Sequence, residues 1–112
     1  MLQPIYFEHD KSNITPLSAN ELDKLVTIMT DNPDIIILVK SHTDSRGTNA
    51  YNIELSERRA KSTVDYIISK GISKIRISGK GFGESDLKIN CTECSDVENS
   101  QNRRSEFMII KK

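Results

Sequence analysis

The chain has 112 residues, of which 36% are hydrophobic and 29% charged, with three prolines and five glycines. This length and composition predict one globular domain with a core of its own. Sixteen basic side chains balance sixteen acidic ones, which argues against a protein that binds nucleic acid or anionic membranes through its overall charge. No apolar run approaches the roughly 18 residues of a membrane span, so a membrane-spanning helix is excluded.

The first third of the chain predicts a short strand followed by an amphipathic helix. Ile5–Phe7 is the strand candidate, and the residue types at 10–13 favour a turn. Ser18 and Glu21 match a capping box, and the pattern ends at Asp31–Pro33. Between them, apolar residues recur at helical spacing: Leu22, Leu25, Val26 and Met29.

The middle of the chain predicts a central strand and a second helix. Ile35–Val39 is a run of branched apolar residues, which is typical of a strand buried on both faces. The second helix is expected from about Asn49 to Lys70, with Gly71 in the left-handed conformation beyond its end. Its apolar stripe consists of Ile53, Ala60, Val64, Ile67 and Ile68.

The remainder predicts two further strands around a polar segment. Lys74–Ser78 alternates apolar and polar residues, and Ser105–Ile110 is the last strand. Residues 86–102 lack clear periodicity and are expected to form a polar loop. The order of elements indicates an α+β fold with helices packed on one mixed sheet.

A polar stretch, residues 41–60, follows the central strand directly. Thr43 and Asp44 are expected at the carboxyl end of that strand, where folds of this kind tend to bind ligands. Asn52, Leu55 and Arg59 share one face of the second helix. If they are held apart, Asp44 can accept an ammonium and Arg59 can donate to a carboxylate. The pattern therefore predicts a receptor for an amino-acid head group.

These two charged residues also have simpler explanations. Asp44 could cap the second helix or pair with Arg46. Arg59 could pair with Glu54 or Glu57 on a solvated helix face. Residue pattern alone leaves these explanations open.

Four ordered segments resemble the OmpA-like peptidoglycan-binding domain, a module also found in peptidoglycan-associated lipoproteins and flagellar stator proteins. The segments are YFEHDKSNI at 6–14, SHTDSRGTNAYNIELSERRA at 41–60, GFGES at 81–85 and NRRSEF at 102–107. The resemblance implies a two-layer α/β sandwich. Its four-stranded mixed sheet has the order 1-4-2-3 with helices on one face, in the sequence β-α-β-α-β-(loop or short helix)-β. The whole chain, 1–112, is then one such domain.

The resemblance also implies a ligand. In this family, the Asp of the HTD motif and the second Arg of the LSxRRA motif hold the diaminopimelate residue of the peptidoglycan stem peptide, and these positions are Asp44 and Arg59. Two departures are Ser41, where the family usually has Gly, and His9, at a frequent Phe position near the ligand. Further contacts are implied for Asp10, Thr43, Asn52, Leu55 and Arg103.

The implied function is non-covalent peptidoglycan binding that anchors the outer membrane to the cell wall. The free end of diaminopimelate carries an ammonium and a carboxylate on one carbon, whereas lysine lacks that second carboxylate. The expected location is the periplasmic domain of an outer-membrane-associated protein. Contact with a membrane is expected only through an upstream anchor missing from this chain, because the chain starts immediately before its first strand.

An enzyme is a competing interpretation of the same polar residues. His42 and Asp44, with Ser41 and Glu84 available, could be imagined as catalytic groups. His42 follows a buried strand, however, and such a position favours a packing role. No nucleophile-elbow or HExxH signature is present, so no catalytic residue is predicted.

A metal site and a protein-interaction module are two more interpretations of the sequence. Cys91 and Cys94 have the spacing of half a zinc site, but no second ligand pair follows, so no metal or cofactor is expected. We expect a disulfide between them if the protein matures in an oxidising compartment. Arg104 is expected to pair with Glu106 or Glu84 as a structural residue. A module of the cell envelope that binds a partner protein instead of peptidoglycan would not require Asp44 or Arg59.

Overall fold

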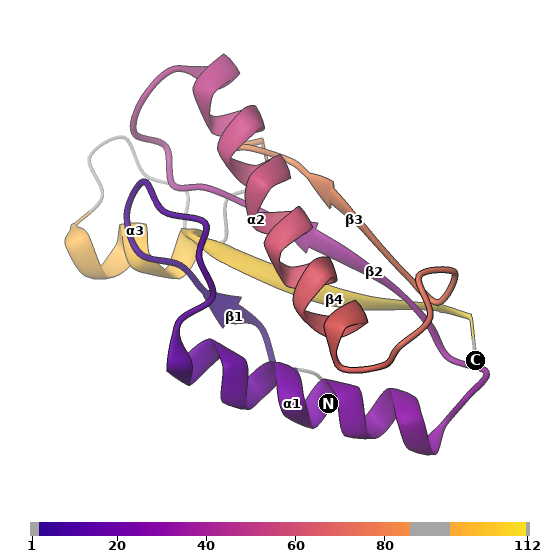
Figure 1. The fold of residues 1–112 in the computed structure, drawn as a ribbon. Helices are drawn as coiled ribbons and strands as arrows, with labels where there is room; N and C mark the ends of the chain where they lie inside the picture. The colour runs from indigo at the N-terminus through magenta and orange to yellow at the C-terminus, as the bar shows by residue number, and fades with distance from the viewer. Residues whose placement is uncertain (1–2, 86–94, 112) are drawn as a thin grey trace.

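The computed structural model describes residues 3–85 and 95–111, which form a four-stranded sheet and three helices. Strand β2 pairs in parallel with β3 and antiparallel with β4, and β4 pairs antiparallel with β1, giving the order β1-β4-β2-β3. Figure 1 shows α1 and α2 on the same face of this sheet. The predicted α+β class and strand order are therefore confirmed. The elements are β1 (Ile5–Tyr6), α1 (Pro16–Asp31), β2 (Ile36–Ser41), α2 (Asn49–Ser69), β3 (Ile77–Gly81), α3 (Asp96–Asn102) and β4 (Arg104–Lys111).

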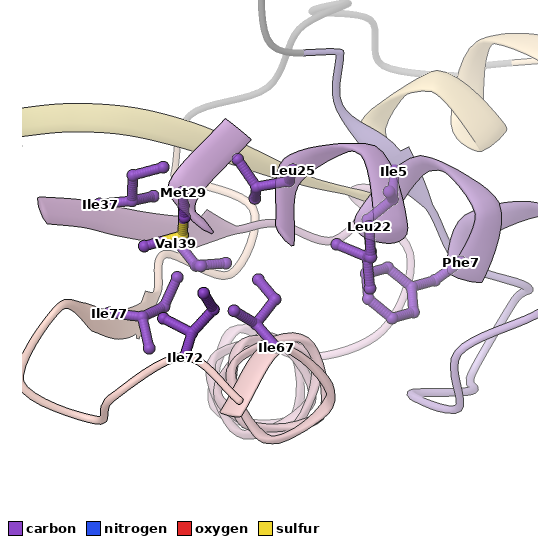
Figure 2. Packing of buried hydrophobic residues seen from close by; sticks show 10 residues of the cluster. All are labelled: Ile5, Phe7, Leu22, Leu25, Met29, Ile37, Val39, Ile67, Ile72 and Ile77. Carbon is purple, nitrogen blue, oxygen red and sulfur yellow. The ribbon is translucent and has the colours of Figure 1, made fainter. Parts of the chain in front are cut away.

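The core lies between the sheet and the two long helices. Ile37 and Val39 of β2 are fully buried and point at the helices, while Ile36, Leu38 and Lys40 are only partly buried. The prediction that this strand is buried on both faces is therefore wrong, because the long helices cover one face. Figure 2 shows the residues that fill the layer: Ile5, Phe7, Leu22, Leu25, Met29, Ile37, Val39, Ile67, Ile72 and Ile77.

Helix α1 begins earlier than the predicted capping box. Thr15 is the N-cap, and its hydroxyl accepts a hydrogen bond from the backbone N of Ser18 at 3.2 Å. Pro16 fits the first turn because its fixed φ suits a helix and it has no N–H to satisfy. Ser18 instead donates its hydroxyl to the carbonyl of Tyr6 at 3.0 Å, and Glu21 pairs with Lys24. The supposed cap thus joins α1 to β1.

Strand β3 lies three residues later than predicted. Residues 73–76 form a turn, with the Arg76 N–H bonded to the Ser73 carbonyl, and Ile75 is 80% exposed. The Arg76 guanidinium donates to the carbonyls of Met29, Asn32 and Ile35. This residue therefore ties the turn to the end of α1, and the local alternation around Ile75 did not reveal that contact.

Helix α2 confirms its predicted end but only part of its predicted apolar stripe. Gly71 follows it with φ of 103°, in the left-handed region that favours glycine. Ala60 and Ile67 are buried and Val64 and Ile68 partly buried, whereas Ile53 is 44% exposed. The reason is that the first turns of α2 bury Asn52, Leu55 and Ser56 instead.

The helix has 21 residues, but none of the described helices is apolar enough over its length to cross a bilayer.

The last part of the chain combines helix and strand. Helix α3 begins with a reciprocal capping box between Ser95 and Glu98, so part of the polar segment is helical. Arg104 is buried and its Nε lies 3.2 Å from an oxygen of Glu106, which confirms the predicted structural pair. The predicted disulfide between Cys91 and Cys94 falls outside the described residues.

Candidate ligand-binding site

Four chain segments meet at the carboxyl end of β2, at one end of the molecule (Figure 1). They are the β1–α1 loop, the β2–α2 loop, the first turns of α2 and the junction between α3 and β4. Between them lies a small recess. All eight residues that the sequence singled out for ligand binding line this recess, together with Arg46: His9, Asp10, Thr43, Asp44, Arg46, Asn52, Leu55, Arg59 and Arg103.

Asp44 supplies a buried carboxylate at the base of the β2–α2 loop. Its Oδ1 accepts the backbone N–H of Arg46 at 3.0 Å. Its Oδ2 accepts from Arg46 Nη2 at 2.8 Å and Nε at 3.3 Å, and from Arg103 Nη1 at 3.4 Å. Burial alone would raise the pKa of Asp44, but the hydrogen bonds and charge of Arg46 outweigh it and hold the pKa below 3.8. Asp44 is therefore ionised at neutral pH.

Arg59 supplies a fully buried guanidinium from α2. It donates to three backbone carbonyls, those of Lys11 at 2.9 Å, Glu8 at 3.0 Å and His42 at 3.1 Å. It also lies 5.1 Å from the centre of the Phe7 ring. Burial lowers its pKa to about 10, and the nearby Arg103 charge acts in the same direction. Arg59 is still charged at neutral pH, and each terminal nitrogen carries a second N–H.

The two opposite charges do not neutralise each other directly. Within the described chain, no ion pair joins Asp44 to Arg59. The simpler explanation for Asp44 is partly right, since it pairs with Arg46, but Thr48 and not Asp44 caps α2. The simpler explanation for Arg59 is wrong, because this side chain is fully buried and donates to backbone carbonyls. Glu54 pairs with Arg58 at 2.6 Å, and Glu57 accepts the Gly81 N–H. An acid and a base are thus held apart in one recess.

Asn52 fixes the loop that carries Asp44. Its Nδ2 donates to the carbonyl of Arg46 at 2.9 Å and to Glu84 Oε1 at 3.1 Å, with a longer contact to the Asp44 carbonyl. Thr43 donates its hydroxyl to that same Asp44 carbonyl. Leu55, one helical turn after Asn52, is buried and gives the recess an apolar wall. These three residues position the loop and shape its surroundings.

The β1–α1 loop forms the exposed rim. Asp10 has φ of 59°, a left-handed conformation that Asp tolerates better than most residues. Its carboxylate accepts the Tyr51 hydroxyl at 3.2 Å and lies 3.5 Å from His9 Nε2. The His9 and Asp10 side chains are 49% and 58% exposed. Both are therefore accessible from solvent.

Two residues next to the site have structural roles. His42 is fully buried, stacks on Phe82 and faces Glu106 at 3.3 Å, in keeping with its predicted packing role. The Ser41 hydroxyl is hydrogen-bonded to Ser105, which in turn contacts Thr63 at 3.2 Å. This buried group of hydroxyls joins β2, β4 and α2. The buried Ser41 hydroxyl is therefore satisfied by its hydrogen bond to Ser105.

Arg46 is the lining residue to which the sequence assigned no ligand role. Its position two residues after Asp44 is the available signal, but that spacing by itself predicts only a pairing between the two side chains.

Among the described residues no group of three or more His, Cys, Asp or Glu side chains could hold a metal ion.

Together, the fold and the recess define a small α+β binding domain with separated opposite charges at the end of its central strand. Comparison with known families then identifies it: the OmpA family matches residues 6–103, and the chain belongs to this family. OmpA-family domains are non-catalytic and generally bind peptidoglycan. The prediction that the chain is not an enzyme rests on this membership.

Curated relatives support the assignment. The chain is 40% identical to Outer membrane protein A of Escherichia fergusonii over 96 residues, which cover 84% of this chain and 39% of the relative. It is 38% identical to Outer membrane protein A of Atlantibacter hermannii with the same coverage. In Outer membrane protein A of Escherichia coli O157:H7 the match covers 28% of the relative. The chain therefore corresponds to well under half of these proteins.

Solved structures share the fold at lower sequence identity. The peptidoglycan-associated lipoprotein of Burkholderia pseudomallei superposes with a TM-score of 0.86 at 22% identity, covering 93% of this chain and 86% of that one. The C-terminal domain of Helicobacter pylori MotB gives 0.86 at 20% identity, covering 96% and 84%. At such identities the likeness shows the fold alone.

Proposed function

We propose that this domain binds peptidoglycan through the diaminopimelate residue of the stem peptide. The observation that carries the proposal is the separation of Asp44 and Arg59 in one recess, each held by groups other than its counterpart. A free diaminopimelate end presents an ammonium and a carboxylate on one carbon. Its ammonium matches the Asp44 carboxylate and its carboxylate matches the Arg59 guanidinium.

Three residues of the recess would contact different parts of the ligand. The ionised Asp44 accepts the ligand ammonium, and the second N–H groups of the Arg59 terminal nitrogens donate to the ligand carboxylate. Leu55 contacts the carbon chain between them. Because Arg59 is anchored to three carbonyls, it is fixed in place before the ligand arrives, so binding does not need to order it.

Membership of the OmpA family supports a location in the cell envelope. The curated relatives carry the name Outer membrane protein A, and the chain matches only part of their length. We propose that the domain lies in the periplasm and that an anchor elsewhere in a longer protein holds it to the outer membrane. Binding to the cell wall would then connect membrane and wall.

Substitution of Asp44 by asparagine tests the proposal most directly. Asp44→Asn keeps the side-chain shape but removes the charge that meets the ammonium. A lost charged hydrogen bond costs about 1.5 to 3 kcal/mol, so affinity should fall about ten- to hundredfold. The measurement is an NMR titration of the labelled domain with L-alanyl-γ-D-glutamyl-meso-diaminopimelate, accompanied by sedimentation with purified peptidoglycan.

Asp65→Asn is the matched control, because Asp65 is an exposed acid on α2 that pairs with Lys61. It changes the net charge equally and should leave affinity unchanged. Equal affinity in Asp44→Asn and the unaltered domain would contradict the proposal. Failure of the unaltered domain to bind either the peptide or peptidoglycan would favour a partner protein as the target.

Arg59→Ala is a poorer first test. Removing the guanidinium leaves the carbonyls of Glu8, Lys11 and His42 without their donor, and buried unsatisfied groups are costly. Lost binding could then reflect lost structure.

A further inference from the structure

Arg46 already donates hydrogen bonds to Asp44 Oδ2, the oxygen proposed to accept the ligand ammonium. Its Nη2 and Nε lie 2.8 Å and 3.3 Å from Asp44 Oδ2. With Arg46 in this position the recess has no space large enough for a water molecule. A ligand that reaches this oxygen must therefore displace the Arg46 side chain.

The three arginines of the recess differ in their freedom to move. Arg59 is fully buried on three carbonyls, and Arg103, with a side chain only 13% exposed, donates its Nε to the Phe7 carbonyl at 2.9 Å. The Arg46 side chain is 39% exposed, and its side-chain hydrogen bonds within the described part of the chain all go to Asp44. Arg46 is thus the arginine that can swing into water with the loss of its hydrogen bonds to Asp44 alone among the described residues.

The Asp44 carboxylate keeps its orientation when Arg46 leaves. Its Oδ1 is held by the backbone N–H of residue 46, which does not depend on the side chain there. Arg103 also remains within 3.4 Å of Oδ2. The acceptor for a ligand is therefore preformed beneath Arg46.

Charge then decides which ligands can displace Arg46. The charged groups lining the recess are two carboxylates, Asp10 and Asp44, and three guanidinium groups. A ligand end with only an ammonium brings a further positive charge next to these three guanidinium groups. It also offers no acceptor to the displaced Arg46 side chain. A ligand end with an adjacent carboxylate offers an acceptor to Arg59 and to the displaced Arg46.

We infer that Arg46 is a specificity-determining residue that competes with ligand ammonium groups for Asp44 and so selects ligand ends in which a carboxylate accompanies the ammonium. The inference rests on the proposed function of the same recess. It assigns to Arg46 the rejection of stem peptides that end in lysine and of simple amines.

The test compares two stem tripeptides, L-alanyl-γ-D-glutamyl-meso-diaminopimelate and the same peptide with L-lysine at the third position. Both are titrated by NMR into the labelled domain and into Arg46→Ala. The variant should bind the lysine peptide about three- to tenfold more tightly, since a half-exposed ion pair no longer competes. Its affinity for the diaminopimelate peptide should change less, so the ratio between the two affinities falls.

Arg58→Ala is the control, because Arg58 is a partly exposed arginine that pairs with Glu54 on the same helix as Arg59. It removes the same charge and should leave the ratio unchanged. An unchanged ratio in Arg46→Ala, with normal preference for diaminopimelate in the unaltered domain, overturns only the role of Arg46. A domain that binds neither peptide overturns the proposed function and this inference with it.

Discussion

Burial sets the behaviour of each charged side chain in the recess. Asp44 and Arg59 are 3% and 0% exposed, whereas the His9 and Asp10 side chains on the rim are about half exposed. A buried charge keeps its ionisation only where partners compensate for lost water. For Asp44 the partners are Arg46 and Arg103, and for Arg59 they are three carbonyls.

Acid titration should reveal the Asp44 contribution to stability. Its folded-state pKa is below 3.8, so between that pKa and 3.8 the unfolded chain binds more protons than the folded one. The contribution is therefore present above pH 3.8 and is lost as pH falls through the folded pKa. Urea unfolding of the unaltered domain and Asp44→Asn should differ by a constant free energy from about pH 5 to 7.

Below about pH 3.8 that difference should shrink, because the carboxylate then becomes protonated. Asp65→Asn gives the baseline for loss of an exposed carboxylate. A difference that stays the same down to about pH 2.5 would show that the ionised form of Asp44 is not the stabilising one.

At the scale of single elements, close approach of α2 and β3 shapes the structure beside the recess. A Cβ at Gly81 would meet the backbone N of Glu57 and the Ser56 hydroxyl too closely to be accommodated. The Gly81 N–H donates to Glu57 Oε1, and the Gly83 N–H donates to the Ser56 hydroxyl. These contacts hold the end of β3 against the first half of α2.

Gly81→Ala should destabilise the domain by about 3 kcal/mol, since a backbone atom of α2 cannot move aside. Gly79→Ala is the comparison, because a Cβ there would meet the Val64 and Ala60 side chains at 3.0 and 3.1 Å. It should cost about 1 kcal/mol, as side chains can shift. Urea unfolding measures both, and an equal or smaller loss at Gly81 would contradict the close approach.

Element positions were predictable where a local signal was strong. The 3.6-residue period placed both long helices, and Gly71 marked the end of α2. The start of β3 was misplaced because Ile75 fits an alternating pattern, while the competing contact of Arg76 with the end of α1 links residues more than 40 positions apart.

For the whole molecule, the site depends on segments distant in sequence. The lining residues come from positions 9–10, 43–59 and 103, so the recess exists only when the sheet has formed. The formal net charge is zero, which leaves recognition to local groups. The proposed binding through one small recess predicts a weak affinity at each site and dependence on multiple attachment.

A tandem of two domains joined by a flexible linker tests whether multiple attachment strengthens binding to peptidoglycan. On intact peptidoglycan, which presents many stems, the tandem should bind at least about a hundredfold more tightly than one domain. On the soluble tripeptide, affinity per site should be unchanged. Sedimentation with peptidoglycan and NMR titration with the peptide give the two values.

A tandem that carries Asp44→Asn in one copy is the control and should bind peptidoglycan like a single domain. A gain that persists in this control would assign the extra affinity to contacts outside the recess.

The sequence by itself determined the class of fold, the family and all of the residues that line the recess except Arg46, because periodicity and ordered motifs are local properties of the chain. Only the tertiary structure decided how the charges are held. The three carbonyls on Arg59, the contact of Arg103 with Asp44 and the separation of Asp44 from Arg59 all depend on segments brought together by the sheet, and long-range contacts of this kind leave no periodic trace in the chain.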